Sequence, residues 1–172
     1  MDTTQLNLIA QKRAKQCFAI AERKLNIRLP FHGIKFFEKS SVAGYVIPAR
    51  DNVVYLNLGL FKKNVEFFER DTIPHEIAHL FADAINKRRR RNEGHHGKTW
   101  KAVMTNVFGL EPKRCHDLDV TGVARKTKKF KYICKCQKHI VSTRTHNKIQ
   151  SKESTYRCRN CLSSLTFLCN MQ

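Results

Sequence analysis

The chain has 172 residues, enough for one domain of ordinary size and a small appended module, but too few for two full domains. Apolar residues make up 41% of it, yet no apolar run approaches the roughly 18 residues of a membrane helix, so we expect no membrane partner. Thirty-three Lys and Arg against 14 Asp and Glu give a net charge of +19. Such a field attracts polyanions, and we expect a nucleic acid, most of all DNA, as a partner.

The N-terminus and the cysteines both indicate a cytoplasmic protein. The first ten residues carry no basic cluster followed by an apolar stretch and a cleavage site, so we interpret them as the start of a folded helix. Seven cysteines, five of them beyond residue 131, suit metal ligation better than a disulfide framework. We expect Cys17 and Cys115 to be ordinary thiols.

The first half of the chain predicts one helix and a small sheet. Apolar residues recur with a helical period from Thr3 to about Leu25, and Pro30 ends that region. A short strand is expected at residues 34–37. Residues 44–58 then predict two short strands joined by a turn near residues 48–52, and hence a hairpin or small antiparallel sheet.

Two further helices follow. The first is expected to begin at Asp71 or Thr72, either of which can cap it, with Pro74 in its first turn. A basic run at residues 87–91 lies at its negative dipole end. The second is expected from His96 to Val107. With the sheet, these helices predict an α+β fold.

Beyond this region the composition changes. A Lys-rich stretch without apolar periodicity leads into the cysteine-rich end of the chain. We therefore expect a main domain over residues 1–123, a basic linker over residues 124–131 and a small module over residues 132–172.

The strongest chemical signal is a pair of histidines on the predicted metal helix. His75 and His79 are four residues apart, so their side chains project from one helix face and can hold one Zn²⁺. Glu76 lies beside that face, where its carboxylate can take a proton from a zinc-bound water. The alternative is a pair of ordinary core or solvent-facing histidines. A third ligand must come from a separate segment: His95 and His96 are candidates, whereas Glu93 is too close for a thermolysin-type glutamate ligand.

The cysteines predict a second, structural zinc site. Cys158 and Cys161 form a C-x-x-C knuckle, and we expect two residues of the preceding arm to complete the site of a zinc ribbon. The three candidates in that arm are Cys134, Cys136 and His139. A site that includes Cys136 is favoured, but the sequence leaves the choice open. Redox-active thiols are the alternative, and Cys169 lies outside both arms as a free thiol.

The order of these motifs resembles a known family. The sequence HEIAH at residues 75–79, then HGKTW at 96–100, GLEP at 109–112 and the cysteine-rich tail is similar to the bacterial SprT-like zinc metalloproteases, which are related to the eukaryotic Spartan proteases. The resemblance covers nearly the whole chain. It implies a zincin-like fold, His96 as the third zinc ligand, and cleavage of proteins crosslinked to DNA. We expect Trp100 of this motif to be a core anchor.

Basic residues are expected to contact the nucleic acid. They lie after the metal helix and before the ribbon: Arg88, Arg89, Arg90, Arg91, Lys128 and Lys129. We also hypothesise that the loop at residues 88–91 gates the cleft. Tyr132 and Tyr156 are predicted to pack beneath the ribbon zinc, with base stacking as the alternative.

These features predict a zinc metalloendopeptidase acting on DNA-associated proteins, with one catalytic and one structural Zn²⁺. The alternative is a nucleic-acid-binding zinc protein with little or no peptidase turnover. A transcription-associated factor is a weaker hypothesis, because no side chains for base readout can be identified.

Overall fold

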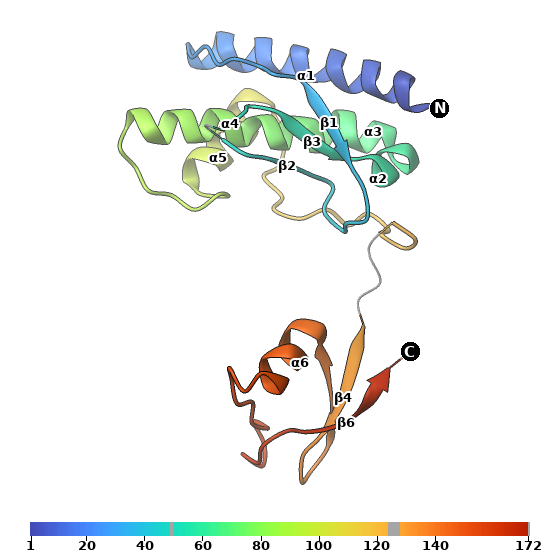
Figure 1. Cartoon of the computed structure of the whole chain (residues 1–172). Coiled ribbons are helices and arrows are strands. Elements are labelled where there is room, and N and C mark those ends of the chain that lie inside the picture. The colour runs from blue at the N-terminus through green and yellow to red at the C-terminus, as the bar shows by residue number, and fades with distance from the viewer. Residues whose placement is uncertain (49, 124–127, 172) are drawn as a thin grey trace. The chain divides into compact units, whose positions relative to one another are not determined.

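A computed structural model describes residues 1–48, 50–123 and 128–171, and it divides into two compact units, Met1–Arg125 and Lys126–Gln172 (Figure 1). The predicted linker falls partly on residues 124–127, outside the described residues. Its last residues belong to strand β4 (Lys129–Ile133), because the side chain of Phe130 is buried in the second unit. Within the described residues, no helix combines the length and apolar character needed to cross a membrane.

Helix α1 (Thr3–Leu25) has the predicted bounds. Its start is a capping box: the Asp2 carboxylate accepts from the Gln5 N–H, and the Gln5 side chain accepts from the Asp2 N–H. Asn26, in the left-handed conformation, ends it. The apolar stripe of α1 is buried in the core of the first unit, as its helical period predicts.

The sheet of the first unit contains β1 (Ile34–Phe37), β2 (Gly44–Val46) and β3 (Val54–Asn57) in the order β1-β3-β2. Strands β2 and β3 pair antiparallel, which confirms the predicted hairpin. The expectation of a wholly antiparallel sheet is wrong, because β1 pairs parallel with β3. The chain reverses direction twice before β3 enters the centre of the sheet, so β3 runs the same way as β1.

A chain of short helices leads into the metal helix. Neither α2 (Leu58–Lys63) nor α3 (Val65–Phe67) was predicted, and the π-helical turn η1 (Phe68–Thr72) joins them to α4 (Ile73–Arg88). The predicted side-chain cap of α4 is wrong: Thr72 is already helical and makes no capping hydrogen bond. Pro74 does lie in the first turn of α4, directly after the π-helical turn.

Helix α5 (Lys98–Ala102) continues into the π-helical turn η2 (Val103–Val107). It begins two residues later than predicted, because Gly97 is the extended N-cap and His96 precedes it. Trp100 is 1% exposed and belongs to the core, as predicted. Helix α4 packs against α1, α5 and the sheet, so the part of it that carries His75 and His79 is held on several sides.

The second unit is a small sheet with one helix. Strand β4 lies between β5 (Lys138–Ser142) and β6 (Thr166–Met171) and is antiparallel to both. The segment between the two cysteine arms forms α6 (Thr143–Gln150), a helix that was not predicted. Tyr132 is fully buried, as predicted, but Tyr156 is 37% exposed, so the packing role predicted for Tyr156 is wrong. The ring of His146 on α6 stacks on that of Phe130, with the two ring centroids 3.7 Å apart.

Candidate metal centre

The structure brings His75, His79 and His96 together. The Nε2 atom of His75 lies 3.3 Å from that of His79 and 3.2 Å from that of His96. Tetrahedral zinc with Zn–N bonds of about 2.0–2.1 Å requires ligand nitrogens about 3.3–3.4 Å apart. Two turns of α4 and the residue before the α5 cap therefore supply three imidazoles at the spacing of one zinc ion.

Burial keeps these imidazoles in the form that binds a metal. It lowers the pKa of His75 to about 4 and that of His79 to about 3, with the neighbouring imidazoles as a smaller cause. The pKa of His96 is also lowered, mainly by burial. At neutral pH the three side chains are uncharged, and each can offer a nitrogen lone pair.

Trp100 forms the wall behind the three imidazoles. Its ring stacks on His79, with centroids 5.3 Å apart and planes 20° apart, and meets His75 and His96 edge to face. The indole N–H points to the backbone carbonyl of His75, 3.4 Å away. The core anchor predicted at this position thus also orients the three imidazole rings.

Glu76 lies beside this centre in a nearly closed environment. It is 6% exposed, and burial raises its pKa to about 8. Gly44, which opens the edge strand β2, makes room for it: a Cβ at Gly44 would lie 3.0 Å from Cγ and 3.2 Å from Oε1 of Glu76. The sequence carries no signal for this contact, because Gly44 and Glu76 meet only through packing of β2 on α4.

The structure also separates the three candidates for the third ligand. His95 is exposed, and its ring lies 6.3 Å from that of His79, outside the three-histidine group. The carboxylate of Glu93 accepts the Thr99 N–H at 2.8 Å and so caps α5. Thr99 in turn donates its hydroxyl to the side-chain oxygen of Asn86 on α4, also at 2.8 Å. This polar clamp of Glu93, Thr99 and Asn86 was not anticipated from the sequence.

The histidines open into a cleft of about 1040 Å³. One wall is the segment of residues 41–46 that includes β2, and the other includes residues 113–118. The walls meet where the His116 Nε2 atom lies 3.1 Å from the Ser41 carbonyl oxygen. Among the described residues that line the cleft, none is from 88–91, so the hypothesis that this exposed loop gates the cleft gains no support from the geometry.

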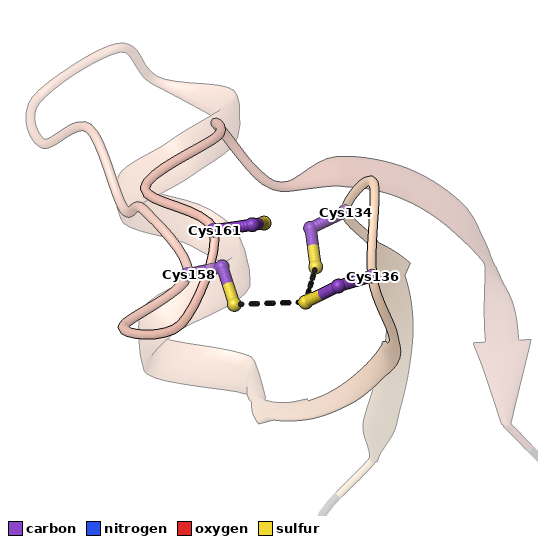
Figure 2. Close-up of side chains that lie close together, drawn as sticks. All are labelled: Cys134, Cys136, Cys158 and Cys161. Carbon is purple, nitrogen blue, oxygen red and sulfur yellow. Dashed lines mark hydrogen bonds between the residues drawn. The ribbon is translucent and has the colours of Figure 1, made fainter.

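Four cysteines of the second unit converge in the same way (Figure 2). The Sγ atom of Cys136 lies 3.5 Å from that of Cys134 and 3.6 Å from that of Cys158, and Cys161 completes the group. A tetrahedral zinc with Zn–S bonds of about 2.3 Å requires sulfurs about 3.8 Å apart. The observed group therefore fits zinc ligation by four thiolates.

His139 lies next to this group rather than within it. Its Nε2 atom is 3.2 Å from the Cys134 sulfur, close enough for a hydrogen bond to a thiolate ligand. Ser163 has a similar position on the other arm, where its hydroxyl and N–H lower the pKa of Cys161 to about 6. Of the residues left open by the sequence, the structure thus groups Cys134 and Cys136 with the knuckle.

The remaining predicted contacts lie on the surface. Lys128 and Lys129 are exposed in the second unit, and the four arginines at residues 88–91 are exposed around the C-terminal end of α4. Cys169 is exposed on β6, Cys115 is exposed and Cys17 is buried in α1. These three cysteines take no part in the two ligand groups found among the described residues.

Comparison with known proteins agrees with this arrangement. The sequence model described as the SprT-like family matches residues 9–116, which contain the three histidines and Glu76. Protein SprT of Vibrio parahaemolyticus is 35% identical over 163 residues, covering 95% of this chain and 94% of that protein. Protein SprT of Yersinia pseudotuberculosis is 32% identical over 172 residues, covering 98% and 97%. No solved structure matches significantly. The chain belongs to the SprT-like family.

Proposed function

We propose that this chain is a zinc-dependent peptidase whose substrates are proteins associated with nucleic acid. One observation carries the peptidase part: three uncharged imidazoles converge beside a buried carboxylate in a cleft of about 1040 Å³. Membership in the SprT-like family supports the same conclusion. The volume of the cleft lies at the upper end of the roughly 300–1,000 Å³ that small-molecule pockets span, so part of a polypeptide substrate can enter it.

Each residue of the centre has a distinct role in this proposal. His75, His79 and His96 hold the metal through their Nε2 atoms and leave a fourth position toward the cleft. Zinc bound there would make a water acidic enough to lose a proton near neutral pH and would polarise the substrate carbonyl. Glu76 accepts that proton and then donates it to the leaving amine.

The surroundings of Glu76 suit both proton transfers. Burial raises its pKa to about 8 in the structure, and a bound cation would bring that value back toward neutrality, because opposite charge favours the carboxylate. A carboxyl group with a pKa near the working pH both accepts and releases a proton readily. Gly44 keeps the carboxylate free of steric contact with β2.

The nucleic-acid part of the proposal rests on charge and on the family resemblance. The second unit has eleven Lys and Arg but a single acidic residue, Glu153, whose carboxylate pairs with Lys148 at 3.0 Å. Such an excess favours a phosphate backbone. Cleavage of proteins crosslinked to DNA is implied by the resemblance to SprT-like and Spartan proteases, and the charge is consistent with that substrate class.

A matched pair of proteins tests the proposal. Wild type and Glu76→Gln are incubated with a protein crosslinked to a DNA oligonucleotide and, separately, with the free protein, and zinc content is measured for each. Because Gln is nearly isosteric and Glu76 is not a ligand, the variant is expected to keep all its zinc. Its cleavage rate should fall at least about 100-fold.

Two outcomes would contradict the peptidase. Equal cleavage by wild type and Glu76→Gln would show that another protease contaminates the preparation. Binding of the crosslinked substrate by zinc-loaded wild type without any cleavage would favour the alternative, a nucleic-acid-binding zinc protein.

A further inference from the structure

Three aromatic side chains lie together on the outer face of the first unit's sheet: Phe37 of β1, Tyr45 of β2 and Tyr55 of β3. Tyr45 and Tyr55 are cross-strand partners whose rings stack with centroids 4.6 Å apart and planes 4° apart. The ring of Phe37 lies 5.1 Å from that of Tyr45, tilted by 48°. We call these three residues the aromatic platform.

The aromatic platform is not part of the hydrophobic core. Alternation along the strands sends the other set of side chains inward, where they join the core formed with α1 and α4: Ile34, Phe36, Val46, Val54 and Leu56. Tyr45, on the opposite face, is 38% exposed. A stacked tyrosine pair contributes to sheet stability, but that role does not require one of its rings to remain so open.

Basic side chains border the aromatic platform. Lys35 is the register partner of Tyr55 on β1, so it lies on the same outer face. The Tyr55 hydroxyl donates to the Asp51 carboxylate at 2.8 Å, and this bond is the main cause of the lowered pKa of Asp51. The positive charges of Arg50 and Lys35 lower that pKa further, which places both cations near the tyrosine hydroxyl.

The acidic group that these contacts place at this face is Asp51. The Asp51 carboxylate is occupied by the Tyr55 hydroxyl and by the N–H of Val53. Two cations, Lys35 and Arg50, therefore lie near one carboxylate that is already hydrogen-bonded, on a chain whose net charge is +19.

We propose that the aromatic platform binds single-stranded nucleic acid, with bases stacked on Tyr45 and the neighbouring phosphates facing Lys35 and Arg50. Every base has an aromatic face, so stacking of this kind needs no particular sequence. An unpaired strand fits better than a duplex, in which the bases already stack on one another.

The position of Tyr45 gives this surface a function. Tyr45 also lines the cleft that contains the three histidines, so the aromatic platform reaches the rim of that cleft at this residue. A protein attached to that strand would then be held at the cleft entrance. This consequence rests on the proposed function, whereas binding of the strand does not.

Photocrosslinking tests the binding directly. The full-length wild type is irradiated with an oligothymidylate that carries 5-iodouracil, and the adducts are mapped by mass spectrometry. We expect an adduct on Tyr45. Affinity for the same oligothymidylate is measured for Tyr45→Leu and Tyr45→Phe, with thermal unfolding and zinc content as checks that both variants are folded.

Loss of one stacked base predicts at least about fivefold weaker binding for Tyr45→Leu, while Tyr45→Phe, which keeps the ring, should bind like wild type. Replacing Lys35 with Ser should reduce the salt dependence by about the slope of one phosphate contact. Adducts confined to the second unit, or equal affinity of the Leu and Phe variants, would overturn the proposal. The proposal would also be overturned if an added unfolded polypeptide, but not added oligothymidylate, prevented formation of the Tyr45 adduct.

These results are independent of turnover. A chain that forms the Tyr45 adduct but cleaves nothing would retain the aromatic platform and lose the peptidase. A chain that cleaves crosslinked protein but forms no adduct at Tyr45 would retain the peptidase and lose the aromatic platform.

Discussion

Replacing Glu93 with Ala tests how the third imidazole is held. The Glu93 carboxylate accepts the Thr99 N–H at 2.8 Å, and its pKa is lowered chiefly by this bond, so it is charged at neutral pH. Gly97, the N-cap of α5, has no side chain for this purpose. Glu93 is therefore one end of the polar clamp of Glu93, Thr99 and Asn86. The clamp ties the loop that carries His96 to α4, the helix that carries the other two histidines.

The size of the effect follows from the kind of interaction lost. Removing a side-chain cap from a helix start costs about 0.5–2 kcal/mol, which is roughly 2- to 30-fold in an equilibrium constant. Residues that orient a metal ligand typically change metal affinity 10- to 100-fold when removed. For Glu93→Ala we expect zinc affinity at the histidine centre to fall roughly tenfold.

Competition with a chromophoric chelator measures this change, and the four-cysteine site of the same chain is an internal reference. Glu93→Gln keeps an acceptor oxygen and should lose less affinity than Glu93→Ala. The matched control is Glu111→Ala: it removes a carboxylate that lines the cleft and whose partner is the exposed Lys113 at 3.3 Å. Unchanged affinity in Glu93→Ala, or an equal loss in Glu111→Ala, would refute the reasoning.

Three further changes test other contacts. Gly44→Ala should displace Glu76, because the added Cβ would lie 3.0 Å from the Glu76 Cγ atom. The peptidase rate should then fall at least about tenfold without loss of zinc. Equal rates for this variant and wild type would contradict the reasoning. In Gly97→Ala the Cβ would lie 2.9 Å from a backbone oxygen, so the loop must move and elemental analysis should show loss of the histidine-bound zinc. Cys136→Ser should lose the zinc of the four-cysteine site, whereas His139→Ala should retain it. Loss of that zinc in His139→Ala but not in Cys136→Ser would make His139 the ligand.

Much of the helical structure could be predicted because it depends on local periodicity. The stripe that predicts α1 ends where the structure ends it, and Asp2 caps it through contacts three residues apart. The metal helix was found for the same reason. Its start next to Thr72 also agrees with the prediction, but the side-chain cap is absent, since η1 runs continuously into α4 and the helix needs no separate cap there.

The short elements were harder to predict. Helices α2, α3 and α6 have three to eight residues, a length at which an isolated helix is unstable and packing decides. The parallel pairing of β1 with β3 depends on which strand enters the centre of the sheet. Nothing in the alternation of residues 34–37 distinguishes that pairing from an antiparallel one.

The sequence by itself determined the chemistry available to this protein. His75, Glu76 and His79 lie within five residues, so helical geometry alone places both imidazoles on one face. The cysteine spacing likewise predicts a second metal site.

Tertiary structure decided which other residues join them. It grouped His96 rather than His95 with the metal helix, and Cys134 with Cys136 in place of His139. It also placed Gly44 against Glu76. The physical reason is the distance along the chain: contacts within one helix turn follow from backbone geometry, whereas contacts between separate segments depend on how the whole core packs.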